Sequence, residues 1–166
     1  PGAATLFSGR NNNLSADKSF EHQHLQESSE ALDHLQTGFL PVSENSLLER
    51  AAERINFVPQ RGDFARGIFS AIYVDTDLSE EQAYELYETY YAAHPFTHVS
   101  KKNIDLKQVV NTNKSIIHLE KHGNKLLILN ATEKLQTGAS GRAFKNMNLM
   151  FGLDERIGLN LKSVGF

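Results

Sequence analysis

The pattern of apolar and polar residues predicts helices and strands that alternate along the chain. The clearest helix begins at Ser79, because Ser79 and Gln82 have the spacing of a capping box. Apolar residues then recur with a 3.6-residue period, at Ala83, Leu86, Tyr87, Tyr90 and Tyr91. We expect these tyrosines to pack in the core, with an aromatic binding platform as the alternative.

Three more helices are predicted. The first begins near His22, where leucines recur at helix-compatible spacing until Gly38, which is placed to end it. The second begins at Ser43 and ends before Ile55. Near the C-terminus, residues 141–151 form a helix that follows a loop of small residues.

Four segments have the pattern of strands. Residues 66–74 are largely apolar on both faces, which predicts an interior strand, and residues 96–99 form a short strand. Residues 114–121 and 125–132 flank a turn that contains Gly123, as in a hairpin. This mixture predicts the α+β class, with a mixed, mainly antiparallel sheet covered by helices.

Composition limits the possible functions. The formal net charge is −3, with 17 Lys and Arg against 20 Asp and Glu, so the chain lacks the basic surface that a nucleic acid needs. No apolar run approaches a membrane span, and we expect a cytoplasmic protein. The chain has no cysteine, which excludes a thiolate nucleophile from these residues.

The strongest candidates for acid/base chemistry are His22 and His24. If the helix begins after His22, then His24 and Glu27 lie on one helical face, where the carboxylate can orient the imidazole. Two alternatives remain open. Both imidazoles could be solvated or helix-capping, or the three side chains could supply ligands of a catalytic zinc ion.

A loop of small residues, Gly138 to Gly141, opens directly into the last predicted helix. Such loops bring the backbone close to a bound nucleotide. The alternative is an ordinary capping turn before a helix whose Ala143, Met147 and Met150 face a core.

In three segments the chain resembles the N-acetyl-gamma-glutamyl-phosphate reductase family. The segments are residues 11–27, with the His-x-His-x-x-Glu pattern, residues 65–68, with Arg-Gly, and residues 138–152. The family pattern is not matched at Glu21, Thr137, Arg142 and Lys145.

The resemblance implies a C-terminal domain like that of glyceraldehyde-3-phosphate dehydrogenase. Residues 1–20 would be a loop from a missing NADP-binding half, and residues 21–137 the substrate and dimerisation domain. Residues 138–152 would be a helix that packs on the missing half, and residues 153–166 a tail.

The resemblance also implies an activity. Members reduce N-acyl-gamma-glutamyl phosphate to the semialdehyde with NADPH in arginine biosynthesis, through a thioester on a cysteine that this chain lacks. The chain alone would then be inactive, and the whole protein would form a homodimer or homotetramer. The alternative is a non-catalytic module that binds a ligand or another protein.

Roles for individual residues follow from the resemblance. His22 would be the catalytic acid/base, and the substrate would contact His24, Glu27, Arg66 and Asn113. A second choice for a substrate-binding cation is Arg61. The cofactor would contact Gly138, Ser140, Gly141 and Asn146.

Overall fold

The computed structural model describes residues 11–37, 55–134, 136 and 140–163. The chain divides into two compact units, Pro1–Phe64 and Ala65–Phe166, which are described separately. Among the described residues, no helix combines the length and apolar character that a bilayer-spanning segment requires.

The first unit contains a short ribbon and one helix. β1 (Ser15–Ala16) pairs antiparallel with β2 (Gln60–Arg61). Next to the ribbon, the Asp17 backbone N–H donates to the Pro59 carbonyl at 2.9 Å. Residues 55–61 therefore hold the segment that leads into the helix.

The helix α2 (Gln23–Thr37) confirms the prediction of a helix near His22. Ser29 is buried, and its hydroxyl donates to the Leu25 carbonyl one turn earlier at 2.8 Å. Leu32, one of the leucines whose spacing predicted this helix, is exposed. The helix predicted from Ser43 lies outside the described residues.

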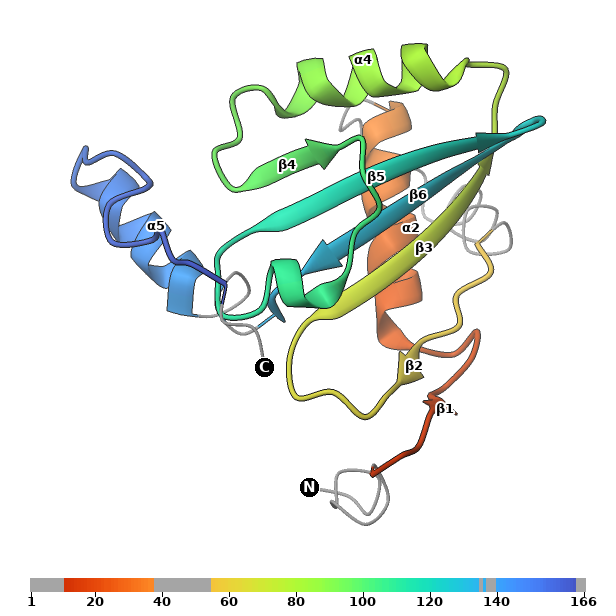
Figure 1. The fold of residues 1–166 in the computed structure, drawn as a ribbon, viewed down its shortest axis with the longest axis horizontal. Helices are drawn as coiled ribbons and strands as arrows, with labels where there is room; N and C mark the ends of the chain where they lie inside the picture. The colour runs from red at the N-terminus through yellow and green to blue at the C-terminus, as the bar shows by residue number, and fades with distance from the viewer. Residues whose placement is uncertain (1–10, 38–54, 135, 137–139, 164–166) are drawn as a thin grey trace. The chain divides into compact units, whose positions relative to one another are not determined.

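The second unit is built on a four-stranded sheet in the order β3-β6-β5-β4 (Figure 1). The strands are β3 (Ile68–Asp75), β4 (Thr97–Ser100), β5 (Ser115–His122) and β6 (Lys125–Thr132). Strand β6 is antiparallel to both of its neighbours, and β4 is parallel to β5. The sheet is therefore mixed and mainly antiparallel, and the α+β prediction is confirmed.

Strand β3 lies at an edge of this sheet, so the prediction of an interior strand is wrong. Its apolar side chains remain exposed on both faces, at Ile68, Phe69, Ile72, Tyr73 and Val74. A strand that is apolar on both faces is expected to be buried on both faces. The pattern does not say whether the burying residues belong to the same unit or to another part of the protein.

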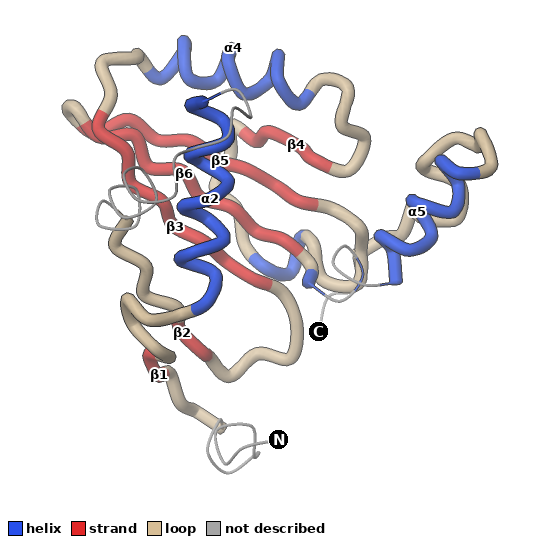
Figure 2. Tube along the Cα trace, turned by 180° about the vertical axis from the view of Figure 1, so that it is seen from behind, coloured by secondary structure: helices blue, strands red, loops and turns tan. Residues whose placement is uncertain are grey.

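The helix α4 (Glu80–Tyr91) begins with the predicted capping box of Ser79 and Gln82. It packs on the sheet next to strands β4 and β5 (Figure 2). Ala83 and Tyr84 are its buried side chains. The predicted stripe is thus partly wrong, because Leu86 and Tyr90 point to solvent. The core under α4 consists of Ala83, Tyr84, Ile117, Leu119, Leu126 and Ile128.

A second core cluster contains Ile104, Val109 and Ala131. Ala131 lies three residues after Ile128 on β6, so its side chain points to the opposite face of the sheet. This face is covered by the connection from β4 to β5, which contains the short 3₁₀ helix η2 (Leu106–Gln108). The last helix, α5 (Gly141–Met150), agrees with the prediction for residues 141–151.

Candidate functional site

In the first unit, the predicted acid/base residues lie together at the start of α2. His22 directly precedes the helix, and the ring centroids of His22 and His24 are 4.7 Å apart. His24 Nδ1 lies 2.7 Å from Glu27 Oε2. The expected orientation of the imidazole by the carboxylate is therefore present in the structure.

His22 also lines an open hollow of about 270 Å³ on the first unit. Phe57 packs against the imidazole with a ring-centroid distance of 5.8 Å, and its carbonyl accepts the Phe20 N–H at 2.9 Å. The ring of His22 is therefore supported from one side and open to a small ligand. The hollow is lined by Phe20, Glu21, His22, Gln23, Leu25, Gln26 and Ser29.

Arg61, the second choice for a substrate-binding cation, is already paired. Its Nε donates to Asp17 Oδ2 at 2.9 Å, and its Nη2 donates to the same oxygen. This pair ties β2 to the residue that follows β1. The structure thus gives Arg61 a partner within the first unit.

In the second unit, the other predicted residues gather at one end of the sheet. The first residue of β3, the last of β6 and the first of β5 lie in register. Arg66 precedes β3 by two residues, and Asn113 precedes β5 by two. The strand register therefore brings Arg66 and Asn113 to the same end of the sheet.

Each side chain has a buried polar atom with no hydrogen-bond partner in the described part of the chain: Arg66 Nη1 and Asn113 Oδ1. Unpaired buried polar atoms are rare in proteins because they have lost water without a replacement. An anionic ligand would satisfy the guanidinium, and a hydrogen-bond donor would satisfy the amide oxygen.

Asn113 also connects three segments of the second unit. Its Nδ2 donates to the Leu159 carbonyl at 3.0 Å. Its Oδ1 lies against Gly141, the first residue of α5, so closely that a side chain at position 141 would overlap with it. Gly141 is therefore required for close packing between α5 and Asn113.

Sequence reasoning missed Glu133, which directly follows β6 and is fully buried. Its Oε2 accepts the Asn111 N–H at 2.9 Å, and Asn111 has a positive φ of 61°. This carboxylate holds the turn that presents Asn113. The available signal was an acidic residue placed directly after an apolar strand.

The residues predicted to contact the cofactor have different positions. The Ser140 hydroxyl donates to Gln136 Oε1 at 3.1 Å, and Asn146 is exposed on α5. Gly141 is buried under Asn113. Gly138 lies outside the described residues.

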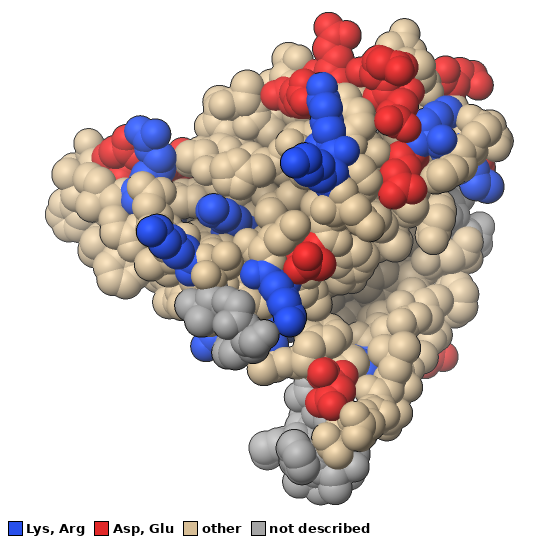
Figure 3. All heavy atoms as spheres, in the orientation of Figure 1, with Lys and Arg blue, Asp and Glu red and all other residues tan. Residues whose placement is uncertain are grey.

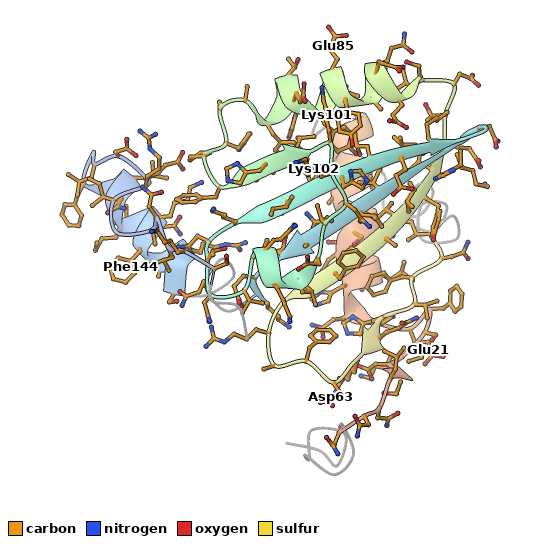
Figure 4. The ribbon with its side chains drawn as sticks, viewed as in Figure 1. Glu21, Asp63, Glu85, Lys101, Lys102 and Phe144 are labelled. Carbon is orange, nitrogen blue, oxygen red and sulfur yellow. The ribbon has the colours of Figure 1, made fainter. Side chains whose placement is uncertain are left out.

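Helix α5 buries the polar side chain of Asn148 and exposes its large apolar side chains. Asn148 is 2% exposed, and its Nδ2 donates to the Ile157 carbonyl at 3.0 Å. By contrast, Met150 is 84% exposed and Phe144 (Figure 4) is 53% exposed. Of the residues expected to face a core if the loop were an ordinary capping turn, Ala143 and Met147 are exposed as well.

The segment after α5, which was expected to be a tail, makes contacts with the rest of the second unit, among them those of Leu159 and Glu155. Leu159 is buried and bonded to Asn113, and Glu155 pairs with Lys145 at 2.7 Å. Leu159 and Glu155 therefore attach this segment to the rest of the second unit.

A larger open hollow, of about 610 Å³, lies beside α4. Acidic side chains gather on this part of the surface (Figure 3), and Glu85 projects from α4 away from the sheet (Figure 4). Lys101 is the one Lys or Arg among its lining residues, and its Nζ lies 3.6 Å from Glu88 Oε1. The lining residues are Glu80, Glu81, Tyr84, Glu85, Glu88, Lys101, Asn103, His118, Leu119 and Glu120.

The floor of this hollow is a structural network. Tyr84 Oη donates to the Leu119 carbonyl at 2.9 Å and lies 3.0 Å from His118 Nδ1, which donates to the Ser100 carbonyl at 2.9 Å. Burial raises the pKa of the Tyr84 hydroxyl, so it stays protonated and able to donate. A hydrogen bond from His122 holds the pKa of Glu120 below its usual range.

Within the described ranges, no three His, Cys, Asp or Glu side chains are grouped closely enough to hold a metal ion. His22, His24 and Glu27 are likewise not arranged as a set of three metal ligands. The zinc alternative therefore has no support from the geometry.

Known proteins similar in sequence identify the family of this chain. The family model described as "semialdehyde dehydrogenase, dimerisation domain" matches residues 1–133. The chain is 51% identical over 166 residues to the N-acetyl-gamma-glutamyl-phosphate reductase of Bacteroides fragilis, covering 100% of this chain and 48% of that protein. A protein of the same name from Flavobacterium johnsoniae is 51% identical over 160 residues, covering 96% of this chain and 46% of its own length.

The mixed sheet and the family match define the chain as the dimerisation part of a dehydrogenase-type protein. It belongs to the semialdehyde dehydrogenase dimerisation-domain family, and the similarity to N-acetyl-gamma-glutamyl-phosphate reductases expected from the sequence is confirmed. The chain spans about half the length of the curated relatives that it matches.

Proposed function

We propose that this chain is the substrate-binding and dimerisation half of a cytoplasmic NADP-dependent reductase of arginine biosynthesis. The reductase converts N-acyl-gamma-glutamyl phosphate to the semialdehyde and releases phosphate. The observation that carries the proposal is the pairing of His24 with Glu27 at 2.7 Å beside His22, in the histidine pattern that resembles this family.

In this proposal, a cysteine outside these 166 residues attacks the acyl phosphate. Phosphate leaves, a thioester forms, and hydride reduction of the thioester releases the aldehyde. His22 is the acid/base, because an imidazole can take and return a proton near neutral pH. The chain alone, which has no cysteine, is inactive.

The substrate carries a carboxylate and a phosphate, and both need cationic or donor groups. Arg66 suits this role because its guanidinium can bind an oxyanion with two parallel hydrogen bonds, and its buried Nη1 has no hydrogen-bond partner among the described residues. We propose His24 and Glu27 as substrate contacts from the first unit, and Arg66 and Asn113 as substrate contacts from the second.

When bound, NADPH supplies the hydride. The residues that we propose to contact this cofactor are Gly138, Ser140, Gly141 and Asn146. The unpaired Asn113 Oδ1 beside the first turn of α5 fits a ligand that brings a hydrogen-bond donor to this place. Gly141 would act indirectly, by leaving room for Asn113.

We further propose that the exposed apolar face of α5 packs on the remainder of the longer polypeptide. Phe144, Met147, Met150 and Phe151 form this face, and α5 follows the residues that match the dimerisation-domain model. The relatives continue for about half of their length beyond the matched part. This remainder would hold the nucleotide and the cysteine.

The proposed partner of strand β3 is a second copy of the chain. β3 is an edge strand with exposed apolar residues on both faces, and it lies within the residues that match the dimerisation-domain model. An uncovered apolar strand of this kind is typical of an oligomer interface. The oligomer would be a homodimer or a homotetramer.

The test is to join this chain to an upstream NADP-binding half and to measure phosphate-dependent oxidation of the semialdehyde with NADP. We expect activity, and we expect His22→Ala to lower kcat by about 10²- to 10⁴-fold. His122→Ala, at the exposed end of β5, is the matched control and should leave the rate unchanged. A joined protein that folds and binds ligand without turnover would favour the non-catalytic alternative.

A further inference from the structure

The two imidazoles at the start of α2 use their Nδ1 atoms in opposite ways: Nδ1 of His22 accepts a hydrogen bond, and Nδ1 of His24 donates one. His22 Nδ1 lies 3.2 Å from the backbone N of His24. A backbone N–H can only donate, so His22 Nδ1 must be an unprotonated acceptor. The proton of the neutral ring is then on Nε2.

This bond is a helix cap. His22 directly precedes α2, and the first N–H groups of a helix have no partner within the helix. The imidazole of His22 satisfies one of them, the N–H of His24, as the side chains of Ser or Asp do at other helices. The start of the helix therefore selects the tautomer of His22.

His24 has the reverse arrangement. Its Nδ1 lies 2.7 Å from Glu27 Oε2, and an ionised carboxylate can only accept. His24 Nδ1 must therefore carry the proton, and its Nε2 is left with a free lone pair. Because Glu27 is one turn along the same helix, the helix fixes this tautomer too.

We propose that His22 and His24 are held as opposite tautomers and divide the proton chemistry of the site. His22 presents an Nε2–H donor, and His24 presents a bare Nε2 that accepts. The two rings are 4.7 Å apart, so one small ligand can reach both. The catalytic part of this assignment rests on the proposed reductase function and refines it. The acid/base work given there to His22 alone is divided: His24 takes and returns the proton, and His22 donates a hydrogen bond.

The division assigns each proton in the proposed reaction. The thiol proton of the outside cysteine moves to His24 Nε2, which leaves a thiolate and an imidazolium whose charge faces the Glu27 carboxylate. His22 Nε2–H donates a hydrogen bond to the substrate oxygen that gains negative charge. The imidazolium of His24 later returns its proton to a leaving oxygen or sulfur atom.

The first experiment measures the tautomers directly in this chain. Long-range ¹H–¹⁵N correlation spectra of ¹⁵N-histidine-labelled protein are recorded at about pH 8, where an ordinary imidazole is neutral. We expect an unprotonated Nδ1 in His22 and a protonated Nδ1 in His24. A protonated Nδ1 in His22, or the same tautomer in both residues, would overturn the assignment.

Three variants test what sets the tautomer of His24. Glu27→Ala should move its proton to Nε2 and leave His22 unchanged. Glu27→Gln should keep the Nδ1–H form, because the amide oxygen still accepts. Glu30→Ala, which removes the next acidic side chain of α2 and its bond to Gln26, is the control and should change neither ring. A His24 tautomer that is insensitive to Glu27→Ala would contradict the proposal.

A second experiment separates this inference from the reductase function. In the joined reductase, Glu27→Ala should lower kcat on the order of 100-fold, and Glu27→Gln should restore most of the rate. If the joined protein has no activity, the reductase function fails while the tautomers stand. If it is active and Glu27→Ala has the wild-type kcat, the division of proton chemistry is wrong.

Discussion

Gly141 has no room for a side chain, because a Cβ there would overlap with Asn113 Oδ1 and with the backbone oxygen of Gln136. We expect Gly141→Ala to lower the free energy of unfolding by about 1–3 kcal/mol, measured by urea denaturation, since the backbone must move to accept the methyl group. Arg142→Ala, the exposed neighbour, should change it by less than about 0.5 kcal/mol. Equal stability of the two variants would contradict the packing at Asn113.

Tyr84 and Tyr90 are six residues apart on α4 and allow a matched comparison. Tyr84 is 7% exposed and its hydroxyl bonds to both backbone groups of Leu119, whereas Tyr90 is 67% exposed. Tyr84→Phe leaves a buried N–H and carbonyl without their partner, and we expect a loss of about 1–3 kcal/mol in the free energy of unfolding. Tyr90→Phe should have no measurable effect, and a similar loss in both would rule out the network.

At the scale of elements, helix α5 exposes its large apolar side chains to solvent, whereas an amphipathic helix ordinarily buries them. Phe144→Ser with Met150→Ser should leave the stability of this chain within about 0.5 kcal/mol of the original, because both side chains are exposed. The same pair should weaken binding to a separately produced NADP-binding half at least tenfold in calorimetry, because those apolar contacts would be lost.

The control for α5 is Asn148→Ala. It removes the bonds to the Ile157 and Glu155 carbonyls and should destabilise this chain itself. If the double serine variant unfolds as readily as Asn148→Ala, the apolar face of α5 is part of this unit's own core, and the proposed docking is wrong.

For the whole molecule, the proposed oligomer depends on β3. Tyr73→Glu places a charge where a second copy would pack, and we expect a shift to monomer at micromolar concentration in sedimentation velocity. Tyr90→Glu on α4 is the control, since Tyr90 and Tyr73 are exposed to similar extents, 67% and 69%. An unchanged oligomer with Tyr73→Glu, or dissociation with both variants, would argue against β3 as the interface.

The candidate site was predictable only in part. His22, His24 and Glu27 are close in sequence, and one helical turn brings Glu27 to His24, so their contact followed from spacing. Arg66 and Asn113 were proposed through a resemblance, and their position at one end of the sheet follows from the strand register. Glu133 was missed because its partner, Asn111, is 22 residues away.

The sequence by itself determined the local elements, because caps, turns and periodicity act between residues a few positions apart. The Ser79 capping box, the hairpin turn at Gly123 and the start of α2 are of this kind. Only the tertiary structure decided that β3 is an edge strand and that α5 faces outward with its apolar side. Those outcomes depend on which distant surfaces cover an apolar face, and a hydrophobic pattern specifies that a face is to be covered without specifying by what.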